Sequence, residues 1–223
     1  ANVGMAAQGA ASLAATFMDI NGDGHLDMFV SAHFLGPSEG WSLEDPGDAT
    51  PAELHLSNGD GTYRDISHKL PEAALLGYTN AAGLLDIDQD GLVELYVAND
   101  FGALTHHNHL YRITPTGNTV EFTDISEETG TELQIFGMGI AYADLNGDSL
   151  PELLITSWDE SVLLESTPGA PYFDSAVSRG ITHEYGLRDV AWGPEFGDLD
   201  NDGDEDLYVV FGYLEYGEED GLA

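Results

Sequence analysis

Carboxylate and amide side chains recur at fixed spacing in four short segments of the chain. Each segment reads Asp-x-(Asp/Asn)-x-Asp-(Gly/Ser)-x-x-(Asp/Glu), and the segments begin at Asp19, Asp86, Asp144 and Asp198. Oxygens at positions 1, 3, 5 and 9, together with the main-chain carbonyl of position 7, suit a hard cation such as Ca²⁺, which takes six to eight oxygen ligands at ~2.3–2.6 Å. The spacing therefore predicts about four bound Ca²⁺ ions.

The predicted ligands are the odd-numbered positions of each nine-residue segment. They are Asp19, Asn21, Asp23, His25 and Asp27; Asp86, Asp88, Asp90, Leu92 and Glu94; Asp144, Asn146, Asp148, Leu150 and Glu152; and Asp198, Asp200, Asp202, Asp204 and Asp206. Position 6 is glycine in three segments, as a tight reversal of the chain favours, but it is Ser149 in the third. We expect that loop to be strained or to bind its ion more weakly.

An EF-hand is a poor alternative, because that motif needs a bidentate Glu at position 12 and a helix on each side. Position 12 is occupied instead by Val30, Val97, Ile155 and Val209, inside apolar runs. A single copy of the motif fits a metal-free Asp/Asn/Gly turn equally well. Four copies with the same flanking pattern favour the metal sites.

Short apolar segments stand on both sides of every acidic segment, and runs of this length bounded by Gly and Asp predict strands. Two further strands are expected in each of the first three repeats, one pair being joined by a hairpin at 58–61. Four strands per repeat predict an all-β chain of β-propeller blades, with three complete repeats and a partial fourth. Helix is expected only near 71–75. The predicted repeats span about 11–67, 78–126, 136–175 and 188–214, followed by an acidic tail at 215–223.

The strongly acidic composition limits the classes of binding partner. The chain has 41 Asp and Glu against 5 Lys and Arg, giving a formal net charge of -36, so nucleic acid and anionic membranes are poor partners. With 42% hydrophobic and 10% aromatic residues, the chain can still bury a core, unlike a disordered acidic tail. No apolar run is long enough to insert into a membrane. The acid exceeds what four Ca²⁺ ions neutralise, which indicates a salty or calcium-rich exterior or a basic partner.

The segments 136–148 and 192–208 resemble the FG-GAP/VCBS repeats of integrin-α-like β-propellers, and more closely those of cartilage-acidic-protein-like (ASPIC/UnbV-type) secreted proteins. The segment 57–66 matches the hairpin that ends such a blade. The resemblance implies Ca²⁺ between the first two strands of each blade and an extracellular or cell-surface location, the periplasm or outer surface in a bacterium. Such propellers typically have seven blades, so the ring would be completed by a longer chain or by neighbouring subunits.

Three further readings remain open at this point. His106 to His109 are interpreted as a polar loop between strands in preference to a transition-metal site, because no other His or Cys set accompanies them. Trp192 lies in a repeat strand and is expected in the core.

The favoured function is a non-enzymatic adhesion, assembly or ligand-binding module with a protein or carbohydrate ligand. The alternative is a fragment of a calcium-propeller polysaccharide lyase or glycoside hydrolase, and adaptation to high salt is compatible with both.

Overall fold

The computed structural model describes residues 11–34, 48–158, 160–181 and 189–213. These residues form four separate antiparallel sheets, in which each strand pairs with the next along the chain. The strands are β1 (Ser12–Met18), β2 (Asp27–Ala32), β3 (Glu53–Ser57) and β4 (Tyr63–Asp65); β5 (Thr79–Leu85), β6 (Glu94–Asn99), β7 (His109–Thr116) and β8 (Thr119–Asp124); β9 (Gly137–Ala143), β10 (Glu152–Ser157), β11 (Val162–Thr167) and β12 (Ala170–Asp174); and β13 (Asp189–Gly197) and β14 (Asp206–Tyr213). The prediction of four-stranded all-β propeller blades is confirmed.

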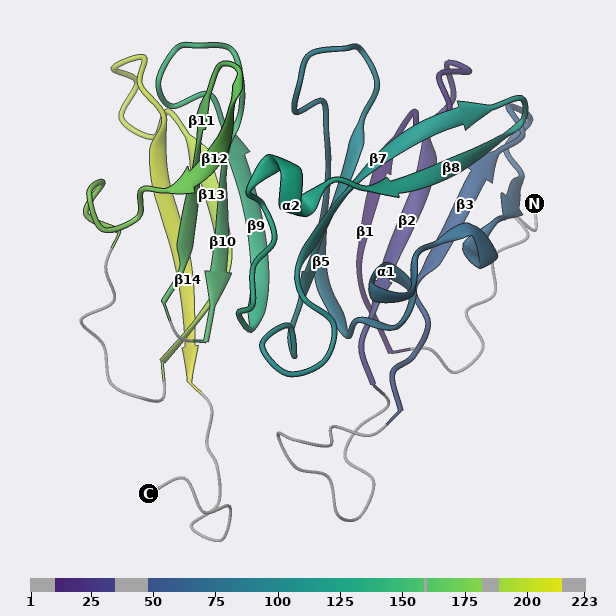
Figure 1. The fold of residues 1–223 in the computed structure, drawn as a ribbon, viewed down its shortest axis with the longest axis horizontal. Coiled ribbons are helices and arrows are strands. Elements are labelled where there is room, and N and C mark those ends of the chain that lie inside the picture. The colour runs from purple at the N-terminus through teal and green to yellow at the C-terminus, as the bar shows by residue number, and fades with distance from the viewer. Residues whose placement is uncertain (1–10, 35–47, 159, 182–188, 214–223) are drawn as a thin grey trace, which may run out of the picture.

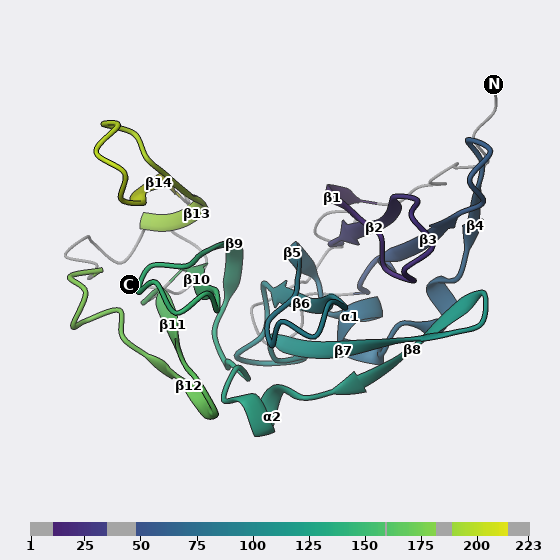
Figure 2. The ribbon, with the colours of Figure 1, turned by 90° about the horizontal axis from the view of Figure 1, so that it is seen from above.

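The sheets stand side by side and fan out in an open arc (Figure 2). Their first strands lie next to one another, since β1 contacts β5, β5 contacts β9, and β9 contacts β13. The four acidic segments connect the first strand of each sheet to the second, and they lie on one face of the arc, at the top of Figure 1. We call them loop 1 (19–27), loop 2 (86–94), loop 3 (144–152) and loop 4 (198–206).

The core lies between neighbouring sheets and is centred on the second strands. Phe29 and Leu54 of the first sheet cluster with Leu95 of the second, whereas Tyr96 of the same strand faces the third sheet and clusters with Ile155. Every residue of β6 and β10 is buried, because each strand is flanked by two strands and covered by a blade on each face. This is why these strands read as continuous apolar runs and show no two-residue alternation.

Helical structure is sparse in the described ranges. Helix α1 (Glu72–Leu76) lies where the sequence predicts a short turn, whereas η1 (Ser67–Lys69) and α2 (Ser126–Thr129) are not predicted. No helix in these ranges has the length and apolarity that a membrane span requires. The predicted acidic tail at 215–223 lies outside the described residues.

The expectation that Trp192 belongs to the core is wrong. The residue is 37% exposed on β13. The indole covers Gly212 of β14, where an added Cβ would lie 2.1 Å from the indole nitrogen. The reason is that the described part of the fourth sheet has two strands, so the outer face of this pair is not covered as in the other sheets.

Candidate metal centre

All four acidic loops share one hydrogen-bond pattern. In loop 2 the carboxylate of Asp86 accepts the amide N–H of Asp90 at 3.1 Å and that of Gly91 at 3.0 Å. The Asp88 carboxylate also accepts the Asp90 amide, at 3.2 Å, and the Asp90 carboxylate accepts the Leu92 amide at 2.8 Å. Loops 1 and 4 repeat these bonds at the same positions. Loop 3 differs only in that Asp144 accepts the amide of Gly147, at position 4, in place of the amide of position 5. The repeated motif therefore produces one repeated conformation.

The backbone of each loop turns through two left-handed residues, at positions 4 and 6. Position 6 has φ of 85° at Gly24, 87° at Gly91, 98° at Gly203 and 71° at Ser149. A side chain in this region is disfavoured by its Cβ, so Ser149 is strained as expected. Position 4 is also left-handed, and it is filled by Gly22, Gln89, Gly147 and Asn201.

The carboxylate at position 9 lies beneath each loop at the start of the second strand. Asp27, Glu94 and Glu152 are completely buried. In each case one carboxylate oxygen accepts the amide N–H of position 2, at 2.9 Å in loop 1, 3.1 Å in loop 2 and 2.6 Å in loop 3. Burial raises the pKa of Asp27 although the amides of Ser57 and Ile20 donate to its carboxylate.

The third strand of the sheet donates a hydrogen bond to the second oxygen of this carboxylate in loops 1 and 3 but not in loop 2. The second oxygen of Asp27 accepts the amide of Ser57 at 2.8 Å. That of Glu152 accepts the amide of Ser166 at 3.2 Å and its hydroxyl at 2.6 Å. The corresponding oxygen of Glu94, Oε1, is buried without a hydrogen-bond partner, the only such side-chain atom in the described ranges.

Glu94 is therefore an acid in an unfavourable environment. Burial raises its pKa to about 7, and the negative charges of Asp88 and Asp90 add to that effect. The Ile87 amide and the Arg112 guanidinium act in the opposite direction. The Arg112 Nε atom lies 4.0 Å from Glu94 Oε1, which is too far for a hydrogen bond.

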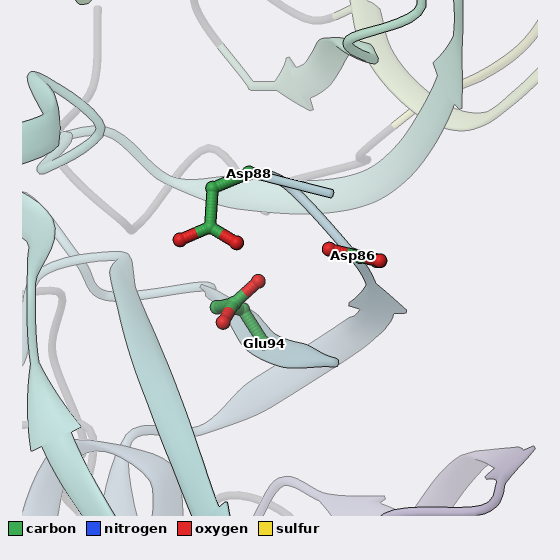
Figure 3. Close-up of side chains that lie close together, drawn as sticks. All are labelled: Asp86, Asp88 and Glu94. Atoms are coloured by element: carbon green, nitrogen blue, oxygen red, sulfur yellow. The ribbon is translucent and has the colours of Figure 1, made fainter. Parts of the chain in front are cut away.

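Two loops bring three carboxylates together. Oxygens of Asp86, Asp88 and Glu94 lie within 4.8 Å of one another, as do those of Asp198, Asp200 and Asp206. Figure 3 shows the first set, with the carboxylates of β6 and loop 2 facing a common space. Both sets are all-oxygen, which is the donor chemistry that Ca²⁺ prefers.

Loops 1 and 3 do not bring three carboxylates together in this way, because their position 3 is asparagine in place of the aspartate of loops 2 and 4. In loop 3 the Asn146 amide donates to Glu152 at 2.9 Å, and the Ser166 hydroxyl donates to Asp148 at 3.1 Å. Neutral donors thus satisfy oxygens of Glu152 and Asp148, whereas Glu94 Oε1 in loop 2 has no hydrogen-bond partner. The ligand roles predicted for all four loops, including the carbonyls of position 7, stay predictions.

The histidine-rich segment contacts nearby carboxylates, and its last residue, His109, begins β7. His107 Nδ1 lies 2.5 Å from Glu132 Oε1, and His109 Nδ1 lies 2.9 Å from Asp124 Oδ2. The two imidazoles stack with their centroids 6.0 Å apart. No group of three or more metal-ligating side chains in the described ranges includes a histidine.

Several residues that complete the sites are absent from the sequence prediction. Ser57, Arg112 and Ser166 come from the third strand of a blade and reach the loop through sheet pairing. Arg112 also borders a cavity of about 470 Å³ between the second and third blades, together with Glu128, Thr129, Leu150 and Tyr172.

One protein family matches part of the chain. Residues 86–155, from loop 2 to β10, match the family described as FG-GAP-like repeat. No curated protein matches the sequence. Among solved structures, the chain is similar to rhamnogalacturonan lyase YesW, with 15% sequence identity and a TM-score of 0.48 over 89% of this chain and 40% of that one. The chain thus spans less than half of that protein, and at this identity and score the likeness says nothing about activity.

Proposed function

We propose that this chain is a calcium-binding β-propeller module that acts without catalysis, in adhesion, assembly or ligand binding outside the cytoplasm. The FG-GAP-like match over 86–155 and the repeated loop geometry support a module of this type. In the proposal each loop holds one Ca²⁺ between the first two strands of its blade. The resemblance of the sequence to ASPIC/UnbV-type secreted proteins favours the same class.

The observation that carries the proposal is the orphaned oxygen of Glu94. A buried polar atom without a partner is unfavourable by about 1–3 kcal/mol, and by more when it carries charge. Three carboxylates within 4.8 Å of one another also repel. A divalent cation among Asp86, Asp88 and Glu94 would remove both penalties at once, and the oxygen ligands favour Ca²⁺ over softer metals.

The proposed ions are structural. Each ion would tie the loop to the buried carboxylate at the start of the second strand, where Asp27, Glu94 and Glu152 lie under the loop. Because the ion binds the folded state alone, it stabilises by mass action. Filling moderate sites requires calcium at the concentrations found outside cells, which is why we propose an extracellular or cell-surface location.

The experiment is a thermal melt of the chain in CaCl₂ and in excess EDTA, with calorimetric titration to count the sites. At Ca²⁺ concentrations a hundredfold above Kd, each filled site adds about 2.7 kcal/mol, which corresponds to roughly 5–10 °C in Tm. The double variant Asp86→Asn/Asp88→Asn should lose one site. The control is Glu121→Gln, which removes an exposed charge on β8 and should lose none. An identical melt in EDTA and CaCl₂, with no heat of binding, would refute the proposal.

The partner of the module is a protein, a carbohydrate, or neighbouring subunits that complete the ring. The strongly acidic chain, with a net charge of -36, favours a partner of opposite charge over nucleic acid. The alternative of a polysaccharide lyase or glycoside hydrolase fragment stays a prediction, and turnover of a glycan panel would be needed to support it.

A further inference from the structure

We propose that Arg112 is a tethered competitor for the cation of loop 2, so that this loop alternates between a guanidinium and a divalent ion. The inference rests on the proposed function, because it concerns the regulation of one of its sites. It makes loop 2 the calcium site whose affinity is set by a side chain from the third strand.

Arg112 faces three carboxylates, two of which belong to the loop 2 cluster. Its NH2 atom lies 3.0 Å from Asp88 Oδ2, and its Nε atom lies 4.0 Å from Glu94 Oε1. Its NH1 atom lies 4.0 Å from Oε1 of Glu128, a residue of α2. The position is fixed by sheet register, because Arg112 of β7 pairs directly with Glu94 of β6. The guanidinium therefore partly neutralises oxygens that a cation in loop 2 would bind.

The corresponding positions of the other complete blades carry no base. The registers Met28 with His55, Leu95 with Tyr111 and Leu153 with Leu164 align Arg112 with the next residue of each third strand. That residue is Leu56 in the first blade, where it is fully buried, and Glu165 in the third, where it pairs with Arg179 at 2.8 Å. Loop 2 is thus distinguished from loops 1 and 3 by an arginine that lies within 4.0 Å of its carboxylates.

The guanidinium is an incomplete substitute for a metal. It donates to Asp88 but stops short of the buried Glu94 oxygen, which stays without a hydrogen bond. A divalent ion would bind both carboxylates and would repel the guanidinium. The arginine has room to withdraw, because its side chain is 37% exposed and borders the 470 Å³ cavity on the side of Glu128. Binding of the ion and release of Arg112 from Asp88 are therefore coupled.

The test measures Ca²⁺ affinity by calorimetric titration of Arg112→Gln. Removing a positive charge this close to the ion should raise the affinity of loop 2 by roughly five- to tenfold, allowing for solvent screening of a partly exposed side chain. In EDTA the same variant should have a lower Tm than the unsubstituted chain, because Asp88 and Glu94 lose their counter-charge. A merely structural role would lower Tm without raising the affinity for Ca²⁺.

Two controls make the measurement specific. Arg112→Lys retains the unit charge and should keep the affinity within about twofold, and Lys69→Gln removes the same charge from an exposed residue of η1 and should leave it unchanged. In the Asp86→Asn/Asp88→Asn background the gain from Arg112→Gln should vanish. Ca²⁺ binding that Arg112→Gln leaves equal or weaker would overturn this inference and leave the proposed function standing. Absence of Ca²⁺ binding by the unsubstituted chain would overturn both.

Discussion

Replacing Glu94 by glutamine should change the stability of the chain in opposite directions with and without calcium. Burial raises the pKa of Glu94 from 4.5 to about 7. The pKa of Glu94 is thus higher in the folded chain than in the unfolded chain, so the protonated acid favours the folded state. This contribution is complete below about pH 4.5 and is lost as the pH rises through about 7. At 1.36 kcal/mol for each pKa unit, the ionised acid disfavours the cation-free fold by about 3 kcal/mol at most.

The neutral amide of Glu94→Gln removes this penalty. In EDTA at pH 8 we expect the variant to be more stable than the unsubstituted chain by about 1–3 kcal/mol, and the difference should shrink towards zero at pH 5. In saturating CaCl₂ the order should reverse, because glutamine offers the ion a neutral oxygen in place of a carboxylate. Urea unfolding followed by circular dichroism, at both pH values and with or without calcium, measures all four conditions.

The matched control is Glu152→Gln at the same position of loop 3. Its carboxylate already accepts from Ser166, Asn146 and Leu145, so an amide there would set an N–H₂ group against donors. This variant should lose stability in EDTA as well as in calcium. The reasoning fails if Glu94→Gln is less stable than the unsubstituted chain in EDTA at pH 8, or if its effect does not depend on pH.

Two further predictions concern the loop backbone and the blade junction. Gly91→Ala places a Cβ in open space at φ of 87°, so its effect is purely conformational, and urea unfolding in EDTA should show that the free energy of unfolding falls by about 1 kcal/mol. The control Gly197→Ala also meets open space but lies in β13, so it should be nearly neutral. Equal effects of the two variants would contradict the strain argument. Tyr96→Phe removes a buried hydroxyl that donates to the Thr131 carbonyl at 3.1 Å, and it should lower the free energy of unfolding by about 1 kcal/mol. Tyr142 is 44% exposed and its hydroxyl donates at 3.4 Å, so the control Tyr142→Phe should change the free energy of unfolding by under about 0.5 kcal/mol. A larger effect of the control would argue against burial as the cause.

The strands were predictable because their signals are local. The apolar runs after each acidic segment coincide with β2, β6, β10 and β14, and the acidic segments themselves contain nearly all the hydrogen bonds that shape the loops. The strand-ending turns were harder to see. Asp65 and Asp124 each accept the amide of a serine two residues later, at 2.8 Å for Ser67 and 2.9 Å for Ser126, and these serines begin η1 and α2. The shared Asp-Ile-Ser spelling was a usable signal.

The environment of the buried carboxylates could not be predicted from the sequence. Ser57 lies 30 residues from Asp27, and Ser166 lies 14 from Glu152, because the connections between second and third strands differ in length. Only strand register brings these partners together. The same holds for Arg112, which the sequence presents as an isolated base and the sheet places opposite Glu94.

The hydrogen bonds within the loops affect how fast an ion can bind. In loops 1, 2 and 4 the carboxylate of position 1 already accepts two amides, and the left-handed turns at positions 4 and 6 are formed by the chain itself. An arriving ion would therefore meet a preorganised loop and would not have to order a flexible one. Little conformational entropy is lost on binding, so the association rate at loops 1 and 4 should be governed by diffusion and by shedding of water from the ion, with no slow folding step in between. At loop 2 the ion must in addition displace the Arg112 guanidinium from Asp88.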